Sequence, residues 1–393
     1  MLCTSTRACT LLLLLPLLFL LLSTYLHGIG RTLQLNVILA NTLTGYQGEP
    51  ANSPEYNAAL RLINLLGLNA PTSVQTVQHM IAADDCPSVE AIRSGRHQQE
   101  TTRSVNNNGY NVNYTRTLWG NPSESESEFD TPDLTIFYAH GGGMVTGCTH
   151  TYQSNADDVA EIWKTRLSLS TVQTVNVAFR NLPRATMEEA ISDFLAVYAH
   201  FVETQQVDPA TVVFEGCSGG GSMVLFSYLQ LLRQQLLPKP LLILSHSPGP
   251  GLEQTPHFLP WEESDAWSSN AQHNEQYFFS NAMGKQWGLE WDETSRTTLK
   301  EWLSDAALMN RLGAEVVITS AAHEMFHHPH EQFMHYYRET TGKKEEDVSS
   351  IQYLSFPNRT HCLQALGFTK FTGPDGEADE RRIFQSIQKV WKR

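Results

Sequence analysis

Short apolar runs alternate with longer amphipathic stretches from residue 134 onward. The runs are rich in β-branched and aromatic residues, which favours strands. They are "LTIFYAH", "VQTVNVAFR", "ATVVFEGC" and "KPLLILSHS". The stretches between them carry apolar residues at helical spacing and predict helices at 151–167, 186–203 and 222–236. Because strands and helices alternate in this way, the sequence predicts a mostly parallel sheet with helices on both faces.

The alternation is interrupted from Gly249 to about Leu299 and then resumes. The later part predicts strands in "AEVVITS" and "SSIQYLSF" and helices in "HEQFMHYYRET" and "DERRIFQSIQKVWK". The interrupting segment is rich in aromatic residues and contains little strand pattern. Since α/β folds bind ligands outside the carboxyl ends of their strands, we interpret this segment as an insertion at that edge of the sheet.

The chain before residue 134 has a different pattern. Helical spacing predicts one or two helices within 53–83, and "YNVNYTRTLWG" alternates like a strand. Thr10 to Leu26 is almost wholly apolar, with a length between those of a signal peptide's apolar region and a membrane-spanning helix. Residues 1–30 are therefore predicted to be a signal peptide or signal anchor. The anchor is favoured because no small-x-small cleavage site follows.

Either form of this leader sends the rest of the chain into the secretory pathway. We expect a lumenal domain held at the endoplasmic reticulum membrane, or a secreted protein if the leader is cleaved. Sequons at Asn113 and Asn358 fit a lumenal environment. An oxidising compartment also permits disulfides, and the four cysteines after the leader can pair in three ways, among which the sequence does not choose. These cysteines are Cys86, Cys148, Cys217 and Cys362.

The overall charge restricts the class of partner. The formal net charge is -14, and no dense stripe of Lys and Arg is present. Phosphate recognition needs a basic surface, so we expect no nucleic-acid partner. No CxxC spacing suggests a zinc site, and we expect neither a cofactor nor a metal.

One glycine-rich segment has the spacing of a nucleophile motif. Residues 216–220 read G-C-S-G-G, which matches G-x-S-x-G, with a predicted strand before and a predicted helix after. This arrangement predicts a sharp turn that exposes the hydroxyl of Ser218, with small flanking residues because the neighbouring backbones approach closely. Cys217 precedes the serine, where the turn points its side chain away from the site, so a packing role is expected for it.

A second glycine-rich segment, His140-Gly141-Gly142-Gly143, directly follows the predicted strand "LTIFYA". Together, HGGG and G-x-S-x-G resemble the hormone-sensitive-lipase family of α/β-hydrolases. The resemblance implies an α/β-hydrolase domain over 31–393, with a helical cap from about 50–95 and 250–300. It also implies that the amides of Gly142, Gly143 and Gly219 form an oxyanion hole. "FRNLPRATMEEAISDFLAVY" resembles a further segment of the family, whose Arg180 and Asp193 we expect to be structural.

A serine nucleophile needs a histidine base and an orienting carboxylate, in the chain order serine, acid, histidine for this fold. Glu324 follows the strand "AEVVITS" and His361 follows the strand in "SSIQYLSF", which are the places that the family uses. We therefore predict Ser218, Glu324 and His361 as the catalytic residues. The family's Asp-Pro-Leu is here Glu-Met-Phe, so Asp305 and Glu331 remain alternative acids.

The segment His323-Glu324-Met325-Phe326-His327 also matches H-E-x-x-H, the signature of zinc proteases. That motif needs a continuous helix, so that both histidines face one metal. Pro329 breaks such a helix and suits the first turn of a new one that begins near His328. We therefore keep a zinc metalloprotease that uses HEMFH only as the less favoured alternative function, and we interpret the histidines of "HEMFHHPH" as a solvated loop.

These observations predict a serine hydrolase that cleaves carboxylic esters, with small acyl or lipid esters as substrates. The apolar N-terminal segment joined to this domain resembles membrane-anchored esterases of the arylacetamide-deacetylase type. An alternative class is a ligand-binding protein that has this fold without catalysis. Four aromatic residues of the insertion either line an acyl pocket or belong to the core. They are Trp261, Trp267, Phe278 and Phe279.

Overall fold

The structure is a computed structural model of the 393-residue chain. It describes residues 98–120, 132–144, 147–182, 184–249, 251–252, 293–324, 326–369, 372 and 375–391. These residues belong to one compact unit, Pro71–Arg393. The leader predicted at 1–30, the cap segment at 50–95 and most of the cap segment at 250–300 lie outside the described residues. Within the described residues, no helix is long and apolar enough to cross a membrane.

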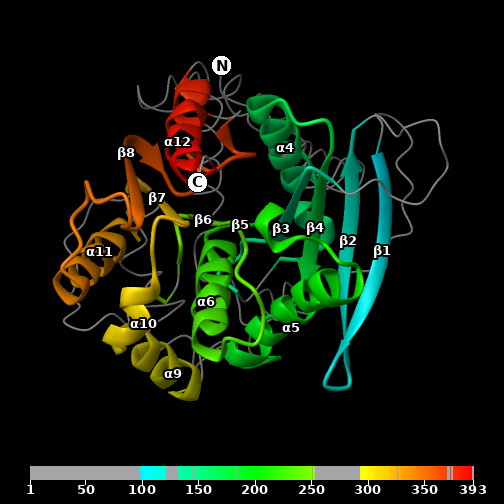
Figure 1. The fold of residues 1–393 in the computed structure, drawn as a ribbon, viewed down its shortest axis with the longest axis horizontal. Helices are drawn as coiled ribbons and strands as arrows, with labels where there is room; N and C mark the ends of the chain where they lie inside the picture. Colours follow the sequence, from blue (N-terminus) through cyan, green and yellow to red (C-terminus); the bar gives the residue numbers. More distant parts are fainter. Residues whose placement is uncertain are drawn as a thin grey trace, which may run out of the picture. The chain divides into compact units, whose positions relative to one another are not determined.

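Eight strands form one sheet in the described part of the chain (Figure 1). They are β1 (Gln98–Asn107), β2 (Tyr110–Trp119), β3 (Leu134–Ala139), β4 (Val172–Ala178), β5 (Val212–Cys217), β6 (Leu242–His246), β7 (Val316–His323) and β8 (Gln352–Thr360). Their order in the sheet is β1-β2-β4-β3-β5-β6-β7-β8. The pairs β1–β2 and β2–β4 are antiparallel, and all the others are parallel. The mostly parallel sheet that the sequence predicts is confirmed.

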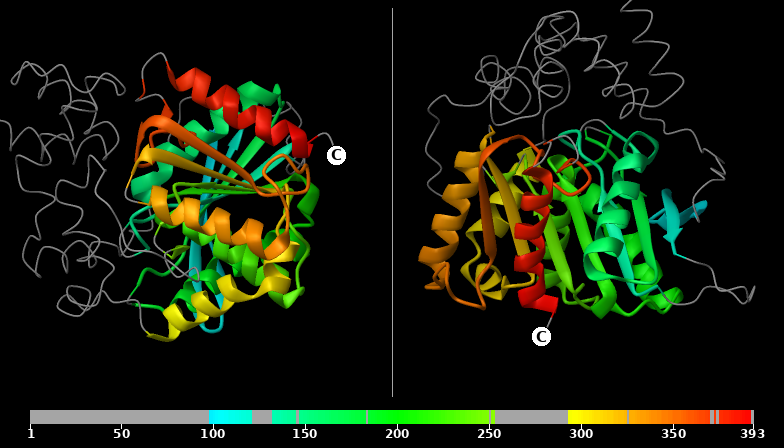
Figure 2. Two further views of the ribbon diagram at one scale, coloured as in Figure 1. Left: turned by 90° about the vertical axis from the view of Figure 1, so that its left-hand side faces the viewer. Right: turned by 90° about the horizontal axis from the view of Figure 1, so that it is seen from above.

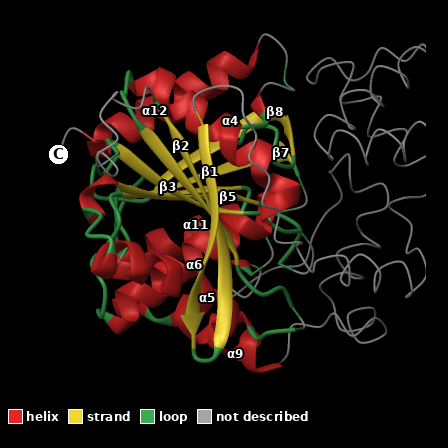
Figure 3. Ribbon diagram, turned by 90° about the vertical axis from the view of Figure 1, so that its right-hand side faces the viewer, coloured by secondary structure: helices red, strands yellow, loops and turns green. Residues whose placement is uncertain are grey.

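Helices cover both faces of this sheet (Figures 1 and 2). They are α4 (Thr149–Leu167), α5 (Met187–Ala199), α6 (Gly219–Gln234), α9 (Glu293–Ser304), α10 (Ala306–Arg311), α11 (His327–Thr341) and α12 (Gly376–Trp391). Helices α4 and α12 pack on one face, and the other five pack on the opposite face (Figures 2 and 3). The layered arrangement predicted from the alternating pattern is therefore also confirmed.

The alternation of side chains along β3 divides the core between the two faces. All six residues of this strand are buried, as expected for a central parallel strand. Ile136 belongs to the apolar cluster beneath α4 and α12, whereas its neighbour Phe137 belongs to the cluster beneath α5 and α6. On the first face Trp163 packs edge-on against Phe384, with ring centroids 5.0 Å apart. A continuous apolar run of the sequence thus contributes alternate side chains to the cores on the two faces of the sheet.

The register of the parallel strands determines where the functional loops lie. Ala139 pairs with Gly216, Cys217 pairs with His246, and His246 pairs with Thr319. The strands β3, β5, β6 and β7 therefore reach their carboxyl ends at a common edge of the sheet. Loops that follow these strands meet at this edge, which is where ligands of α/β folds bind.

The strand β1 was not anticipated in the sequence analysis. Its sequence, QQETTRSVNN, is almost wholly polar and lacks the alternation that marks a half-buried strand. It forms an antiparallel hairpin with β2 through Asn108 and Gly109, which have φ angles of 50° and 89°. An Asn-Gly pair is the strongest local signal for such a two-residue turn. The hairpin was therefore recognisable from its turn, although not from its hydrophobic pattern.

Candidate active site

Ser218 occupies the turn between β5 and α6. Its backbone has φ 59° and ψ -126°, a conformation that residues other than glycine rarely adopt. The Ser218 amide donates to the His246 carbonyl at 2.9 Å, and the Ser218 carbonyl accepts from the Ser222 amide at 3.0 Å. The helix begins at Gly219, three residues before the start predicted from apolar spacing. The sharp strand-to-helix turn predicted from G-x-S-x-G is present, and it places Ser218 at the carboxyl edge of the sheet.

The glycines around Ser218 are required by the close approach of three backbone segments. A Cβ atom on Gly216 would lie 2.5 Å from the carbonyl group of Gly220 and 2.8 Å from the Ala139 oxygen. A Cβ atom on Gly220 would overlap the same Ala139 oxygen. These contacts involve backbone atoms, which no change of rotamer can move away. The small residues therefore allow β3, β5 and the start of α6 to pack together at the turn, as the motif predicted.

The HGGG segment lies directly beside this turn. A Cβ atom on Gly219 would lie 2.8 Å from the amide nitrogen of Gly143 and 2.6 Å from that of Met144. Gly142 and Gly143 have φ angles of 106° and 64°, which glycine adopts without a steric penalty. The three residues predicted to form an oxyanion hole, Gly142, Gly143 and Gly219, thus lie on two adjoining backbone segments.

The segment after β4 is hydrogen-bonded to the residue that follows the HGGG segment. The Leu182 amide donates to the Met144 carbonyl at 2.8 Å. Arg180 contacts the buried carboxylate of Asp193 through its Nε at 2.7 Å and through its Nη2 at 3.0 Å. This two-point ion pair links the segment to α5, which carries Asp193. Arg180 and Asp193 bind each other in the structural arrangement that was expected for them.

His361 lies between Ser218 and Glu324, although the three residues come from distant parts of the chain. Its Nε2 atom is 2.9 Å from the Ser218 hydroxyl oxygen, and its Nδ1 atom is 2.6 Å from Oε2 of Glu324. With the proton on Nδ1 donated to the carboxylate, Nε2 is the acceptor of the serine proton. The ring is 17% exposed, so solvent reaches it. The structure therefore places the three predicted side chains in one hydrogen-bonded line.

The carboxylate of Glu324 is wholly buried, and both of its oxygens are hydrogen-bonded. While Oε2 contacts His361, Oε1 accepts from the Ala321 amide at 2.8 Å and from the Ser320 hydroxyl at 3.0 Å. Burial raises the pKa of this carboxyl group, but the hydrogen bond and charge of His361, together with the nearby His330 ring and the Ser247 hydroxyl, outweigh burial. The pKa therefore lies below its ordinary value, and Glu324 is ionised near neutral pH.

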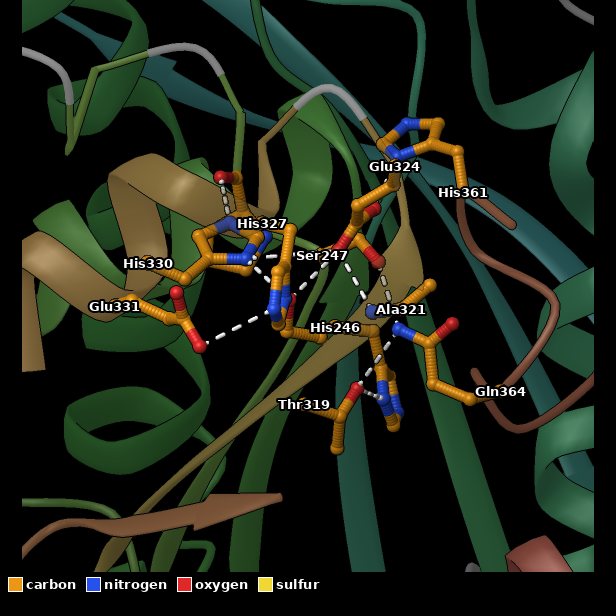
Figure 4. Close-up of polar contacts among 12 residues, drawn as sticks. His246, Ser247, Thr319, Ala321, Glu324, His327, His330, Glu331, His361 and Gln364 are labelled. Carbon is orange, nitrogen blue, oxygen red and sulfur yellow. Dashed lines mark hydrogen bonds and ion pairs between the residues drawn. The ribbon is translucent and has the colours of Figure 1, made fainter. Parts of the chain in front are cut away.

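A second histidine, His330, lies on the other side of this carboxylate (Figure 4). Its Nδ1 atom is 2.8 Å from the Ser320 hydroxyl and 3.5 Å from Oε1 of Glu324. Its Nε2 atom is 2.7 Å from the Pro248 carbonyl oxygen, to which it donates. His330 is fully buried within α11. The interpretation of the "HEMFHHPH" histidines as a solvated loop is therefore wrong. His323 ends β7, the other three histidines lie in α11, and this helix turns the His330 ring inward.

The two alternative acids have other partners. Asp305 caps the start of α10, where its carboxylate accepts from the amides of Ala307 at 2.9 Å and Leu308 at 3.1 Å. Glu331 is exposed and lies 3.2 Å from Nε2 of His327. Neither carboxylate contacts His361 within the described structure, whereas Glu324 does. The geometry thus favours Glu324 among the three acids that the sequence left open.

The H-E-x-x-H segment does not form a helix that carries both histidines. Strand β7 ends at His323, and α11 begins at His327. Pro329 lies within the first turn of α11, as predicted, where its missing amide costs no helical hydrogen bond. The glutamate of the motif, Glu324, points to His361 instead. No group of metal-binding side chains occurs among the residues that the structure describes.

A disulfide joins Cys217 to Cys362, across 145 positions of the sequence. The Cα atoms of the two cysteines are 6.1 Å apart. The prediction gave Cys217 only a packing role. The side chain is buried, but it also forms a covalent bond to the loop that carries His361. Cys148 is disulfide-bonded as well. The tertiary structure thus selects a pairing that the spacing of the cysteines left open.

A buried polar network beneath the site was not found by sequence reasoning. Gln364 donates to the hydroxyls of Ser247 at 2.6 Å and Thr319 at 3.2 Å, and Nδ1 of His246 is 2.8 Å from the Thr319 hydroxyl (Figure 4). His246 is also 3.4 Å from Oε1 of Glu215. Such polar residues belong to no motif, and most of them lie within or at the end of predicted buried strands. They connect β6, β7 and the loops after β6 and β8.

We expect acid to destabilise the fold through two buried histidines, His140 and His330. Burial lowers the pKa of each ring from 6.5 to about 4. As the pH falls below 6.5, the unfolded chain binds protons at these sites while the folded chain does not, so the free energy of unfolding decreases until about pH 4. His330→Gln should reduce the loss between pH 7 and pH 4.5 by roughly 2 kcal/mol, measured by urea unfolding.

The matched control for this prediction is His335→Gln, which changes a histidine that is 74% exposed on the same helix. Its dependence of stability on pH should equal that of the wild-type protein. If the free energy of unfolding changes with pH by the same amount in the wild-type, His330→Gln and His140→Gln proteins, these rings bind protons equally in the folded and unfolded states.

A comparison with known families decides the classification of the chain. The sequence profile of the family described as the alpha/beta hydrolase fold matches residues 136–363, more than half of the chain. The chain belongs to the α/β-hydrolase fold family. The match includes Ser218, Glu324 and His361, and the predicted fold class is therefore confirmed.

Solved structures resemble this α/β-hydrolase over most of its length. An esterase from Pseudomonas putida has a TM-score of 0.57 at 16% identity, covering 88% of this chain and 98% of its own. A hormone-sensitive lipase from a metagenome library has a TM-score of 0.54 at 17% identity, covering 84% and 97%. An esterase from the archaeon Pyrobaculum calidifontis has a TM-score of 0.56 at 14% identity, also covering 84% and 97%. At these identities the likeness establishes the fold.

Proposed function

We propose that this α/β-hydrolase is a serine hydrolase that cleaves carboxylic esters through an acyl-enzyme. The observation that carries the proposal is the hydrogen-bonded line from Ser218 through His361 to Glu324, with distances of 2.9 Å and 2.6 Å. This line lies beside the glycine amides of the HGGG segment and the nucleophile turn. A nucleophile, an oriented base and donors for an oxyanion are the parts that acyl transfer needs.

The proposed reaction begins when the Ser218 hydroxyl oxygen attacks the ester carbonyl carbon while its proton moves to Nε2 of His361. The amides of Gly142, Gly143 and Gly219 donate to the oxyanion that develops on the carbonyl oxygen. When the tetrahedral intermediate collapses, His361 gives its proton to the departing alcohol, which leaves Ser218 acylated. His361 next deprotonates a water molecule, whose attack releases the carboxylic acid and restores the serine.

Glu324 supports both halves of this cycle through His361. The carboxylate accepts a hydrogen bond from Nδ1–H, which holds the proton on Nδ1 and keeps Nε2 free to act as the base. Each time His361 becomes an imidazolium, the adjacent negative charge stabilises it. The lowered pKa of Glu324, which results from its neighbours overcoming the effect of burial, keeps that charge in place near neutral pH.

Esters are the substrate class that the comparisons support. The similar solved structures include proteins titled as esterases or lipases, and a crystal of another, EstE5, was soaked with p-nitrophenyl butyrate. One similar structure is titled a hormone-sensitive lipase, which agrees with the resemblance in the HGGG and G-x-S-x-G motifs. We therefore propose small acyl or lipid esters as substrates.

We also propose a location in the secretory pathway, with the catalytic domain in the lumen or outside the cell. The apolar segment Thr10 to Leu26 supports this location, and so does the disulfide between Cys217 and Cys362. Disulfides persist in oxidising compartments and are rare in the cytosol. Residues 1–30, the leader, lie outside the described structure.

The full-length protein should hydrolyse p-nitrophenyl acetate, butyrate, octanoate and palmitate at different rates, which define its acyl-chain preference. A fluorophosphonate probe should label it at Ser218, as located by mass spectrometry, and should stop turnover. A zinc chelator should leave both turnover and labelling unchanged. If the folded protein binds these esters without turnover or labelling, it is a binding protein and the proposed function is wrong.

A further inference from the structure

We propose that the disulfide between Cys217 and Cys362 is a positioning element for the serine and the histidine of the site. The inference rests on the proposed function, because it concerns how that site is held together. Cys217 directly precedes Ser218, and Cys362 directly follows His361. The bond therefore joins the two reacting residues through their immediate neighbours in the chain, across 145 positions.

The sheet by itself does not bring these two residues together. Cys217 ends β5 and His361 follows β8, and in the sheet β6 and β7 lie between those two strands. Adjacent strands are roughly 4.8 Å apart, so the ends of β5 and β8 are separated by about 14 Å of sheet. The Cα atoms of Cys217 and Cys362 are nevertheless 6.1 Å apart. The loop after β8 must therefore reach back over two strands.

Three other hydrogen bonds hold this loop to Ser247 and Thr319 rather than to the nucleophile turn. The Cys362 amide donates to the Ser247 hydroxyl at 3.4 Å, a long hydrogen bond. Gln364 donates to the hydroxyl of Ser247, which follows β6, and to the hydroxyl of Thr319, which lies in β7. Besides the disulfide, this loop contacts the nucleophile turn through the hydrogen bond from Ser218 to His361 itself. That bond must break and re-form during each turnover, so it cannot serve as a permanent anchor.

The backbone at Cys362 also needs an external restraint. Its φ angle is 65°, in the left-handed region that residues other than glycine and asparagine seldom occupy. A residue held in such a conformation persists where the surrounding structure constrains it, and these residues gather at functional sites. Ser218, at the other end of the connection, has a comparable φ of 59°. The disulfide thus joins two unfavourable backbone turns and limits the motion of each relative to the other.

Positioning of this kind acts on the chemical step more than on binding. A displacement of about 1 Å between a nucleophile and its base lowers the rate by roughly 100-fold, while contacts that bind the rest of the substrate are unaffected. Removal of the disulfide should therefore lower kcat and change KM little. It should also slow the reaction of Ser218 with a fluorophosphonate, since that reaction needs the same serine and base.

A dithiol reductant tests the same bond in the unaltered protein. One molecule of dithiothreitol supplies two electrons and two protons, becomes a cyclic disulfide, and leaves Cys217 and Cys362 as thiols. Cys217 is buried and the residue Cys362 is partly exposed, so we expect the reductant to reach the bond from the side of Cys362. Activity should fall as the two thiols form, and it should return on reoxidation by oxidised glutathione.

The experiment compares the full-length wild-type protein with Cys217→Ser, Cys362→Ser and the double variant. Each should show kcat for p-nitrophenyl butyrate lowered by about 10- to 100-fold, with KM changed less than about threefold. The double variant should be no slower than either single one, because each change breaks the same bond. Dithiothreitol should reproduce the loss in the wild-type protein and have no effect on the double variant.

A matched control separates positioning from a general loss of stability. Cys148→Ser removes another disulfide that is near the HGGG segment in the sequence, and it should leave kcat and the rate of labelling unchanged. All measurements are made at a temperature at which circular dichroism shows each variant folded. A folded double variant with wild-type kcat and labelling rate would overturn the positioning role. A wild-type protein that is neither active nor labelled would overturn the proposed function as well.

Discussion

Replacing Ser218 with alanine should lower kcat for ester hydrolysis by about 10⁴-fold or more, because it removes the proposed nucleophile. The fold should survive the change, since the backbone contacts of the turn come from the main-chain atoms of residue 218. Alanine at φ 59° is no more strained than serine there. The expected result is a folded protein with no fluorophosphonate labelling and a residual rate close to that of the uncatalysed reaction.

The control for this prediction is Ser222→Ala, which changes the second serine of the same glycine-rich segment. Ser222 is buried within α6, and its amide donates to the Ser218 carbonyl, a bond that the substitution keeps. We expect this variant to retain activity within about threefold of the wild-type value. Normal turnover by Ser218→Ala, with labelling moved to another residue, would show that the nucleophile lies elsewhere.

Replacing Glu324 with glutamine should lower kcat by about 10³- to 10⁴-fold. Glutamine has nearly the same shape, but its amide group does not stabilise an imidazolium and offers His361 a donor in place of an acceptor. Nδ1 would then lose its proton to Nε2 and the base would be in the wrong tautomer. Turnover of p-nitrophenyl butyrate measures this loss, and thermal unfolding shows whether the variant remains folded.

The two other acids provide the control for Glu324. Asp305→Asn keeps a capping side chain at the start of α10, and Glu331→Gln changes an exposed residue, so both should retain nearly full activity. Because neither carboxylate contacts His361, neither change should alter how kcat depends on pH. A large loss in Glu331→Gln together with normal turnover in Glu324→Gln would reverse the assignment of the acid.

The order of strands and helices followed directly from the hydrophobic pattern. The strands β3 to β8 and the helices α4, α5, α6, α11 and α12 all occur where the pattern predicted them, with shifts of a few residues at their ends. Buried parallel strands are continuous apolar runs, and helices that cover a sheet have an apolar side, so both leave a local signal. The strand β1 left no such signal, because it lies at the edge of the sheet, where polar residues are tolerated.

Candidate residues of the site were also found in the sequence, because each stands beside a local feature. Ser218 lies in a glycine motif, and Glu324 and His361 directly follow strands. The structure brings these three side chains together, while their catalytic roles remain predictions that the variants above test. The choice among Glu324, Asp305 and Glu331 could not be made locally, since it depends on which carboxylate the register of β7 and β8 brings to His361.

Two features of the site had no usable local signal. His330 lies in the segment 323–330, which contains four histidines and resembles a solvated loop in its polar character. The structure shows instead that α11 turns the His330 ring inward. The pairing of Cys217 with Cys362 could not be chosen from spacing, because the separation of two cysteines along the chain says nothing about their distance in space.

By itself the sequence determined the α/β architecture, the turn that carries Ser218 and the neighbourhood of its candidate partners. These are consequences of short-range patterns: side-chain periodicity, glycine at crowded turns, and residues that follow strands. The tertiary structure decided which acid contacts His361, which histidine is buried behind that acid, and which cysteines are joined. Each of these depends on the distance between residues far apart in the chain, and such distances exist only after the strands have paired and the helices have packed.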